Sequence, residues 1–416
     1  MMKLSVLGGS SYYTSLLFEA LAQQKDELHL DEVMLNGRNE AKLEDVARFG
    51  QNLFKRFGVN TAVTFTTDRR RAIEGSDLIL CQIRVGGMKA RAVDESIPRK
   101  YGIIGDETVG PGGFCCALRT VPVMADIASE IRAYAPNALV VDLTNPASIV
   151  VEAILNRENI NMIGICDLPL IVLSRAAEVL HADYNALSGK YFGLNHLGFY
   201  SNIYCNGEDV TSEVLEHVED LKLGIDPRLV RSMGLVPVPF LRFFYHSAQV
   251  MEEQKNQPVR GEVLYENEKQ LAKIFAQPDL SEIPELIRQR NAIWYSHAVV
   301  PFMAAYVSGQ KRNFIVNIRN RGRIADLDDN DIVEVSEDID ALKMWRTDAV
   351  KMPLYVRGLV QAVKAYESMT VQAIYEQSYD KAVLALMSHP LVGQYDVAKA
   401  MLDDMLCAYP EVDYLR

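Results

Sequence analysis

The sequence predicts an α/β protein whose first domain is a doubly wound parallel sheet. Short segments that are apolar throughout alternate with amphipathic helical segments, which is typical of parallel strands covered by helices on both faces. The first apolar segment runs into a pair of glycines, as at the opening of a Rossmann-like dinucleotide-binding unit. We expect this unit to form a domain over residues 1–170 and an α+β domain to follow over residues 171–416.

The elements of the first domain follow from the apolar pattern in chain order. Short apolar runs predict strands at 3–9, 31–38, 77–87, 138–148 and 161–167. Helical spacing of apolar residues predicts helices at 15–24, at 41–57 and near 118–135. Residues 90–114 read as a long connection rich in Gly and Pro, and connections of this length are more often functional than structural.

The pattern changes in the second domain. Residues 189–214 predict antiparallel strands around the Asn206–Gly207 turn, because Asn-Gly is a strong hairpin signal. The remainder is expected to be mostly helical, with residues 370–391 as the clearest example.

Composition limits the classes of partner and the compartment. Apolar residues make up 49% and charged residues 24%, which is ordinary for a globular protein, and the formal charge of −12 argues against nucleic-acid binding. No apolar run approaches the roughly 20 residues of a membrane span, and the N-terminal run is too short for a secretory leader. The six cysteines show no CxxC spacing. We therefore expect a cytoplasmic protein that binds neither nucleic acid nor membrane.

A cofactor site is predicted where the first strand meets the first helix. Gly8 and Gly9 allow close backbone approach, and Ser10, Ser11 and Tyr12 follow at the start of the helix. Amides and hydroxyls at such a junction suit a pyrophosphate. The spacing is not GxGxxG, so the prediction depends on its place after the first strand.

The end of the second strand bears on the choice of dinucleotide. Asn36 stands where a carboxylate usually bonds the ribose 2′-hydroxyl, and Arg38 follows where an Arg can receive a 2′-phosphate. An ordinary Asn-Gly turn is the alternative. We expect NAD and leave NADP open, and we assign Arg84 to the same cofactor.

Three further residues stand out at strand ends. Asn145 precedes a Pro at the edge of the sheet, where its amide would point into the ligand crevice. Cys166 ends a strand and His196 lies on an apolar strand, and each alone is more often a core residue. Beside a cofactor site, a thiolate and an imidazole completed by substrate oxygens and water would suit Mn²⁺ or another divalent metal.

An ordered set of motifs carries a resemblance over nearly the whole chain. They are VLGGSSYYT (6–14), IRVGGMKARAVDESIP (83–98), GDETVGPGGFCCALRTVPV (105–123), LTNPASIVVEA (143–153), GICDLP (164–169) and YFGLNH (191–196). The chain resembles glycoside hydrolase family 4, especially its 6-phospho-β-glucosidase branch. The resemblance implies a Rossmann-like domain followed by an α+β domain like that of lactate and malate dehydrogenases, in a homodimer or homotetramer.

The resemblance also implies a reaction. In this family NAD⁺ oxidises the sugar C3 hydroxyl, C1–C2 elimination releases the aglycone, water adds, and the hydride returns, with a divalent metal, usually Mn²⁺, on the sugar oxygens. The implied substrate is a 6-phosphoglucoside. The alternatives are another anionic or unphosphorylated glycoside, a dehydrogenase of the lactate/malate type, and a sensor that binds NAD and sugar without catalysis.

Residue by residue, the resemblance implies these roles. The metal ligands are Cys166 and His196, and the residues that bind the sugar or its phosphate are Arg91, Glu107, Asn145, Asn195, Arg260 and Arg290. Asp167 is typical of the 6-phospho-α-glucosidase branch, where it can act as a general acid.

One departure affects the catalytic base. Phe240 stands where the family has a Tyr, and a Phe cannot take a proton. The candidates that remain are Tyr245, Tyr295 and Asp167.

Overall fold

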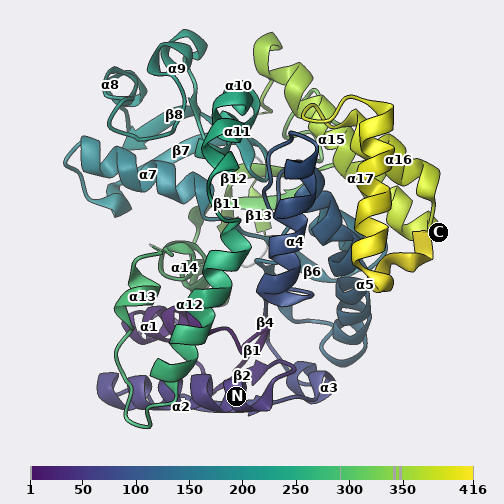
Figure 1. The fold of residues 1–416 in the computed structure, drawn as a ribbon. Helices are drawn as coiled ribbons and strands as arrows, with labels where there is room; N and C mark the ends of the chain where they lie inside the picture. Colours follow the sequence, from purple (N-terminus) through teal and green to yellow (C-terminus); the bar gives the residue numbers. More distant parts are fainter. Residues whose placement is uncertain (1, 291, 341–342, 346–348, 416) are drawn as a thin grey trace.

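The computed structural model describes residues 2–290, 292–340, 343–345 and 349–415 (Figure 1). Its strands are β1 (Lys3–Leu7), β2 (Glu32–Asn36), β3 (Ala62–Thr66), β4 (Leu78–Cys81), β5 (Leu139–Asp142), β6 (Asn161–Gly164), β7 (Leu187–Leu194), β8 (Leu197–Cys205), β9 (Glu208–Asp209), β10 (Val236–Pro237), β11 (Arg312–Arg319), β12 (Ile332–Asp340) and β13 (Lys343–Trp345).

The α-helices are α1 (Ser15–Gln23), α2 (Glu40–Phe57), α3 (Arg69–Ile73), α4 (Gly87–Lys100), α5 (Gly110–Tyr134), α6 (Ala147–Leu155), α7 (Leu168–Val179), α8 (Thr211–Glu216), α9 (Pro227–Met233), α10 (Arg242–Tyr245), α11 (Ser247–Lys255), α12 (Arg260–Phe275), α13 (Glu285–Arg288), α14 (Val300–Ser308), α15 (Leu354–Glu376), α16 (Tyr379–Ser388) and α17 (Tyr395–Ala408). Short turns of other helix types include η1 (Tyr12–Thr14), η3 (Pro239–Leu241) and the π-helical η4 (Tyr295–Val299).

The strands of the described residues form one continuous sheet. Its first half is parallel in the order β3-β2-β1-β4-β5-β6, the doubly wound arrangement that the apolar strands predict. At the far edge, β6 pairs antiparallel with β11 through Gly164 and Asn317. The sheet then continues through β12, β7, β8 and β10. The expected fold class is therefore confirmed, and the two halves share a sheet.

Helices of the second half pack on the first half. In Figure 1, α12 and α4 stand side by side above the N-terminal strands, and α15, α16 and α17 lie together on the side of α5. α15 packs on α5 and α6, and α17 packs on α4. Every residue of α6 from Ala147 to Ile154 is buried. No helix in the described part of the chain is long and apolar enough to cross a membrane.

The reading of 90–114 as one long connection is wrong for most of its length. Residues 87–100 form α4 and α5 begins at Gly110, so the connection shrinks to 101–109. The helix was hard to recognise because part of its buried face is charged: Arg91, Asp94 and Glu95 are buried beside Ala90.

The predicted antiparallel strands exist, but the principal hairpin turns elsewhere. β7 and β8 pair with Leu194 opposite Leu197, so Asn195 and His196 form the turn. His196 has a left-handed φ of 64° and lies at the hairpin tip instead of on a strand. The Asn206–Gly207 turn joins β8 only to the short β9.

Other elements depart from the expected pattern. β3 was not predicted, and neither were β11, β12 and β13 in the part expected to be mostly helical. The segment 370–391 is mostly helical, as expected: it holds the end of α15 and the whole of α16, which are separated at Gln377, whose φ is 54°.

Candidate active site

A cavity of about 780 Å³ lies where β1, β2, β4, β5 and β6 end. This edge is where open α/β sheets bind their ligands. The sequence-predicted residues that line it are Gly8, Ser10, Ser11, Asn36, Arg38, Arg84, Arg91, Glu107, Asn145, Cys166, Asp167, His196, Arg260, Arg290 and Tyr295. The predicted residues that do not line it are Gly9, Tyr12, Asn195 and Tyr245.

The glycine loop is held by the backbone of β2. The amides of Gly8 and Gly9 donate to the Asn36 carbonyl at 3.0 and 2.8 Å. Gly8 has a φ of 91°, and a Cβ there would lie 2.6 Å from the Gln82 carbonyl oxygen. Position 8 therefore requires glycine. The loop passes close to β4 and presents Ser10 and Ser11 to the cavity.

The aromatic pair after the loop divides between core and cavity. Tyr12 is buried and its ring centroid lies 4.7 Å from that of Phe275. Tyr13, which the sequence did not single out, lines the cavity instead and lies under the guanidinium of Arg290 at 4.6 Å.

The two predicted metal ligands face the same cavity from the two halves of the chain. Cys166 follows β6, and His196 projects from the β7–β8 turn. The His196 Nδ1 lies 2.8 Å from the Thr108 hydroxyl, which leaves Nε2 as the ring nitrogen without this contact. A partner on one ring nitrogen is the usual way that a metal-binding His is oriented.

The electrostatics of this pair fit a bound cation. Burial raises the pKa of the Cys166 thiol well above its usual range, and the charge of Glu334 raises it further. A thiolate there needs a positive charge beside it, which a divalent ion would supply. Among the described residues no group of three or more His, Cys, Asp or Glu is arranged to hold a metal.

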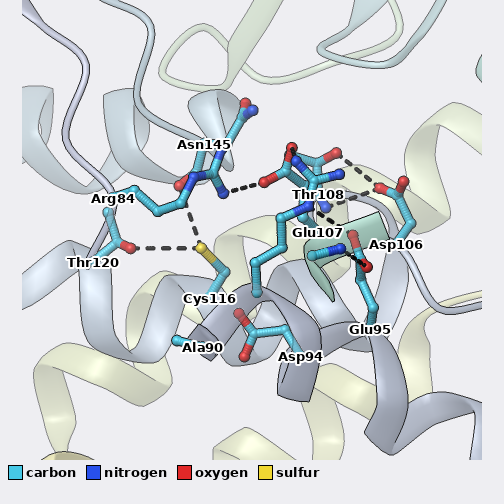
Figure 2. Close-up of polar contacts among 12 residues, drawn as sticks. Arg84, Ala90, Asp94, Glu95, Asp106, Glu107, Thr108, Cys116, Thr120 and Asn145 are labelled. Carbon is cyan, nitrogen blue, oxygen red and sulfur yellow. Dashed lines mark hydrogen bonds and ion pairs between the residues drawn. The ribbon is translucent and has the colours of Figure 1, made fainter. Parts of the chain in front are cut away.

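Arginines converge on a single carboxylate (Figure 2). Arg84 is ion-paired with Glu107. The Arg91 Nη1 lies 2.7 Å from the other oxygen of Glu107. Burial alone would raise the pKa of Glu107, but Arg84, Arg91 and Arg290 outweigh it and lower the pKa to about 2. Glu107 is therefore ionised, and its charge partly neutralises the positive charge of Arg84, Arg91 and Arg290.

Two further arginines are less engaged. Arg260 begins α12, is exposed and lines the cavity. Arg290 lies over the rings of Tyr13 and Trp294, at 4.6 and 5.2 Å. Guanidinium groups of this kind suit a phosphate monoester.

The loop that carries Glu107 is fixed from both ends. Asp106 Oδ1 accepts bonds from the amides of Thr108 and Val109 and from the Thr108 hydroxyl, all at 2.9 Å. The first turn of α5 lies against it so closely that a Cβ at Gly112 would be 1.9 Å from the Asp106 carbonyl oxygen. The glycines of this motif thus serve close packing of the loop.

Phe240, which we matched to the family's Tyr, belongs to the same cavity. Its ring meets the His196 ring edge-on at 4.8 Å. The Asp167 Oδ1 lies 3.8 Å from the Cys166 sulfur. The structure does not bring Tyr245 to the cavity.

Tyr295 lines the cavity, and its hydroxyl donates to Gln82 Oε1 at 2.6 Å. Burial raises the pKa of Tyr295 to about 12. Gln82 also donates to the Thr14 hydroxyl at 2.9 Å, so it joins the start of α1 to Tyr295. Sequence reasoning missed Gln82, although its place directly after β4 was a usable signal.

The two predicted amides lie in different surroundings. Asn145 lines the cavity at the start of a cis Asn145–Pro146 step. Asn195 points behind the hairpin tip, where its amide donates to Glu334 Oε1 at 3.0 Å. Glu334 was missed by sequence reasoning because it belongs to the unpredicted β12.

Family models match both halves of the chain. The model described as family 4 glycosyl hydrolase matches residues 3–182, and the model of the family's C-terminal domain matches residues 191–392. The chain therefore belongs to family 4 of the glycosyl hydrolases, as the motifs predict.

Relatives with both anomeric preferences are similar to the chain. The 6-phospho-beta-glucosidase BglT of Thermotoga maritima is 32% identical, with 99% of each chain covered. A phospho-alpha-glucosidase, PagL of Clostridium acetobutylicum, is 30% identical, with 96% of each covered.

Solved structures agree with the fold. The Thermotoga maritima 6-phospho-beta glucosidase with manganese, NAD⁺ and glucose-6-phosphate superposes with a TM-score of 0.93 at 31% identity over 99% of each chain. Malate dehydrogenase of Plasmodium falciparum, at 14% identity over 90% of this chain and 99% of its own, shares the fold alone, with a TM-score of 0.54.

Proposed function

We propose that the protein hydrolyses 6-phosphoglucosides with the help of a nicotinamide dinucleotide and a divalent cation. One observation carries the proposal: a single cavity brings the glycine loop, the Cys166–His196 pair and a cluster of arginines together. The relatives named above act on, or were solved with, such ligands.

The chain's own residues then have these roles. Gly8, Ser10 and Ser11 receive the dinucleotide pyrophosphate, and Cys166 and His196 hold the cation. When bound, the dinucleotide takes and returns a hydride, and the cation polarises neighbouring sugar oxygens.

The sugar lies between these two sites and the arginines. Arg91, Arg260 and Arg290 hold its 6-phosphate, while the Asn145 amide orients its hydroxyls. Asp167 and Tyr295 keep their predicted part in proton transfer, since both line the cavity. Phe240 places an apolar ring against His196 and excludes water there.

The β-anomer is the favoured substrate, because the order of motifs follows the 6-phospho-β-glucosidase branch. Asp167 is the feature that favours the α-anomer instead. A cytoplasmic location and a homodimer or homotetramer stay predictions.

The test is direct. Purified protein is incubated with NAD⁺, Mn²⁺, a reductant and the 4-nitrophenyl 6-phosphoglucoside of each anomer. We expect release of nitrophenol, faster from the β-anomer, and loss of deuterium from C2 into water. Absence of turnover with both anomers, with dinucleotide binding demonstrated, would contradict the proposal.

A second candidate function is a sensor that binds dinucleotide and sugar phosphate without turnover. Phe240 favours it, because a Phe beside His196 cannot take the C2 proton. If wild type is inactive and Phe240→Tyr gains activity, the sensor is supported. If wild type is active and Phe240→Tyr loses activity, the site has its own base.

A further inference from the structure

One end of the cavity is lined by residues that have no role in the proposed function so far. Asn36, Gly37 and Arg38 line it after β2, and Thr67 and Arg69 line it after β3. In a sheet with this strand order, the end of the second strand faces the ribose of the adenosine half of a dinucleotide. This end therefore decides which adenosine is accepted.

The carboxylate that normally bonds the ribose 2′-hydroxyl is replaced. β2 ends at Asn36, whose amide donates to the Thr66 carbonyl at 3.0 Å. Glu268 is the carboxylate among the described residues that line this end, and it is ion-paired with Lys42. A 2′-phosphate would thus meet no unpaired negative charge from the described residues here.

A cation is also available at this end. Arg38 is exposed, lines the cavity, and makes no ion pair with any described residue. Arg69 differs, because it donates to both oxygens of Glu130 at 2.7 and 2.5 Å. A guanidinium without a counter-ion can bond a phosphate with two N–H groups and gives up no existing pair.

The turn geometry keeps this Arg close to the glycine loop. A Cβ at Gly37 would lie 2.9 Å from the Ser10 hydroxyl oxygen, so the turn packs directly on the loop. Asn39 then caps α2 by accepting a bond from the Lys42 amide at 3.0 Å. The backbone of Arg38 is therefore held between these two contacts, while its side chain is exposed.

We infer that the site takes NADP in preference to NAD, with Arg38 holding the 2′-phosphate. The inference rests on the proposed function, because it names the dinucleotide for the same cavity. The Thermotoga maritima relative was solved with NAD⁺. A preference for NADP would therefore distinguish this chain from that relative, and we assign it to the residues after β2.

Dinucleotide binding by the full-length protein tests the inference without turnover. NADPH and NADH are titrated by fluorescence, and adenosine 2′,5′-bisphosphate and 5′-AMP by calorimetry. We expect the ligand with the 2′-phosphate to bind about tenfold tighter or more in each pair.

Variants locate the effect. Arg38→Gln should weaken NADPH about tenfold to hundredfold and change NADH by no more than about twofold. Asn36→Asp should reverse the preference, because a carboxylate accepts a hydrogen bond from the ribose 2′-hydroxyl of NADH and repels the 2′-phosphate of NADPH. Arg56→Gln is the matched control, since Arg56 is an exposed arginine of α2 that pairs with Glu282 and does not line the cavity.

Two outcomes would overturn the inference alone: NADH bound as tightly as NADPH, or Arg38→Gln weakening both equally. In either case, turnover of a 6-phosphoglucoside with NAD⁺ would leave the proposed function standing. Binding of neither dinucleotide would overturn both.

Discussion

At the scale of single residues, the partners of the proposed ligands matter as much as the ligands. Thr108 fixes the His196 ring through its hydroxyl at 2.8 Å. Thr108→Val should therefore weaken Mn²⁺ binding about tenfold to hundredfold, the usual effect of losing such a partner. Calorimetric titration with Mn²⁺ measures it. Thr64→Val on β3 is the control, and an unchanged affinity in Thr108→Val would argue against His196 as a ligand.

A second residue-scale prediction concerns stability and pH. The pKa of Glu107 is lowered to about 2 in the folded protein, although burial opposes the shift, because arginines surround it. A group whose pKa is lowered stabilises the fold above its unfolded pKa, about 4.3 for Glu, and loses this contribution as pH falls toward 2. Glu107→Gln should therefore cost about 3 kcal/mol at pH 7.

Urea unfolding of wild type and Glu107→Gln at pH 7, 5 and 3 measures this difference. The deficit should be equal at pH 7 and 5 and clearly smaller at pH 3. Glu282→Gln serves as control, because its side chain is 76% exposed and exposed ion pairs contribute little. A deficit that does not change with pH would mean that the substitution at position 107 disturbs packing instead of charge.

At the scale of elements, the β7–β8 hairpin determines where His196 lies. Gly193 has a φ of 146°, and a Cβ there would be 2.3 Å from the Leu197 carbonyl oxygen. Gly193→Ala should cost about 2 kcal/mol or more and weaken Mn²⁺ binding. Thermal unfolding and metal titration measure both effects.

Gly358 provides the matched control. It lies within α15, and a Cβ there meets nothing within 4 Å. Gly358→Ala should therefore raise stability by up to about 1 kcal/mol, because alanine favours helix. If both variants lost stability to the same extent, the hairpin geometry would not be the cause.

The predictable elements were those with simple apolar patterns. Strands β1, β4, β5 and β6 are buried on both faces and therefore read as apolar runs. β11 and β12 were missed because their buried positions include polar side chains: Asn317 and Glu334 are bonded to each other at 2.9 Å, and Glu337 pairs with Arg323. Such pairing depends on tertiary contacts that a local pattern does not contain.

The candidate site was predictable where the sheet edge alone places a residue. Asn145 and Cys166 follow adjacent parallel strands, so their meeting follows from topology. Thr108 and Gln82 were not predictable as partners, because their contacts join segments far apart in sequence. Which of Tyr12 and Tyr13 faces the cavity depends on the short η1 turn.

At the scale of the whole molecule, buried charge joins the halves. Lys364 of α15 lies 2.9 Å from Glu152 of α6 and 2.5 Å from Glu367, and all of these side chains are at most 7% exposed. Lys364→Met would leave buried carboxylates without their cation. We expect the free energy of unfolding to fall by about 3–5 kcal/mol, as measured by urea unfolding. Lys399→Met is the control and should cost less than about 1 kcal/mol, because the ion pair of Lys399 with Asp403 is about half exposed. Equal losses would mean that the buried cluster does not join the halves.

A backbone carbonyl holds the glycine loop, and this affects how the coenzyme preference can evolve within the family. Gly8 and Gly9 both donate to the carbonyl of Asn36, while its side chain bonds elsewhere. A substitution at position 36 can therefore alter the adenosine end and leave those two bonds intact. The coenzyme preference can thus change by a single substitution at position 36, because the backbone carbonyl that holds the glycine loop is present in every amino acid.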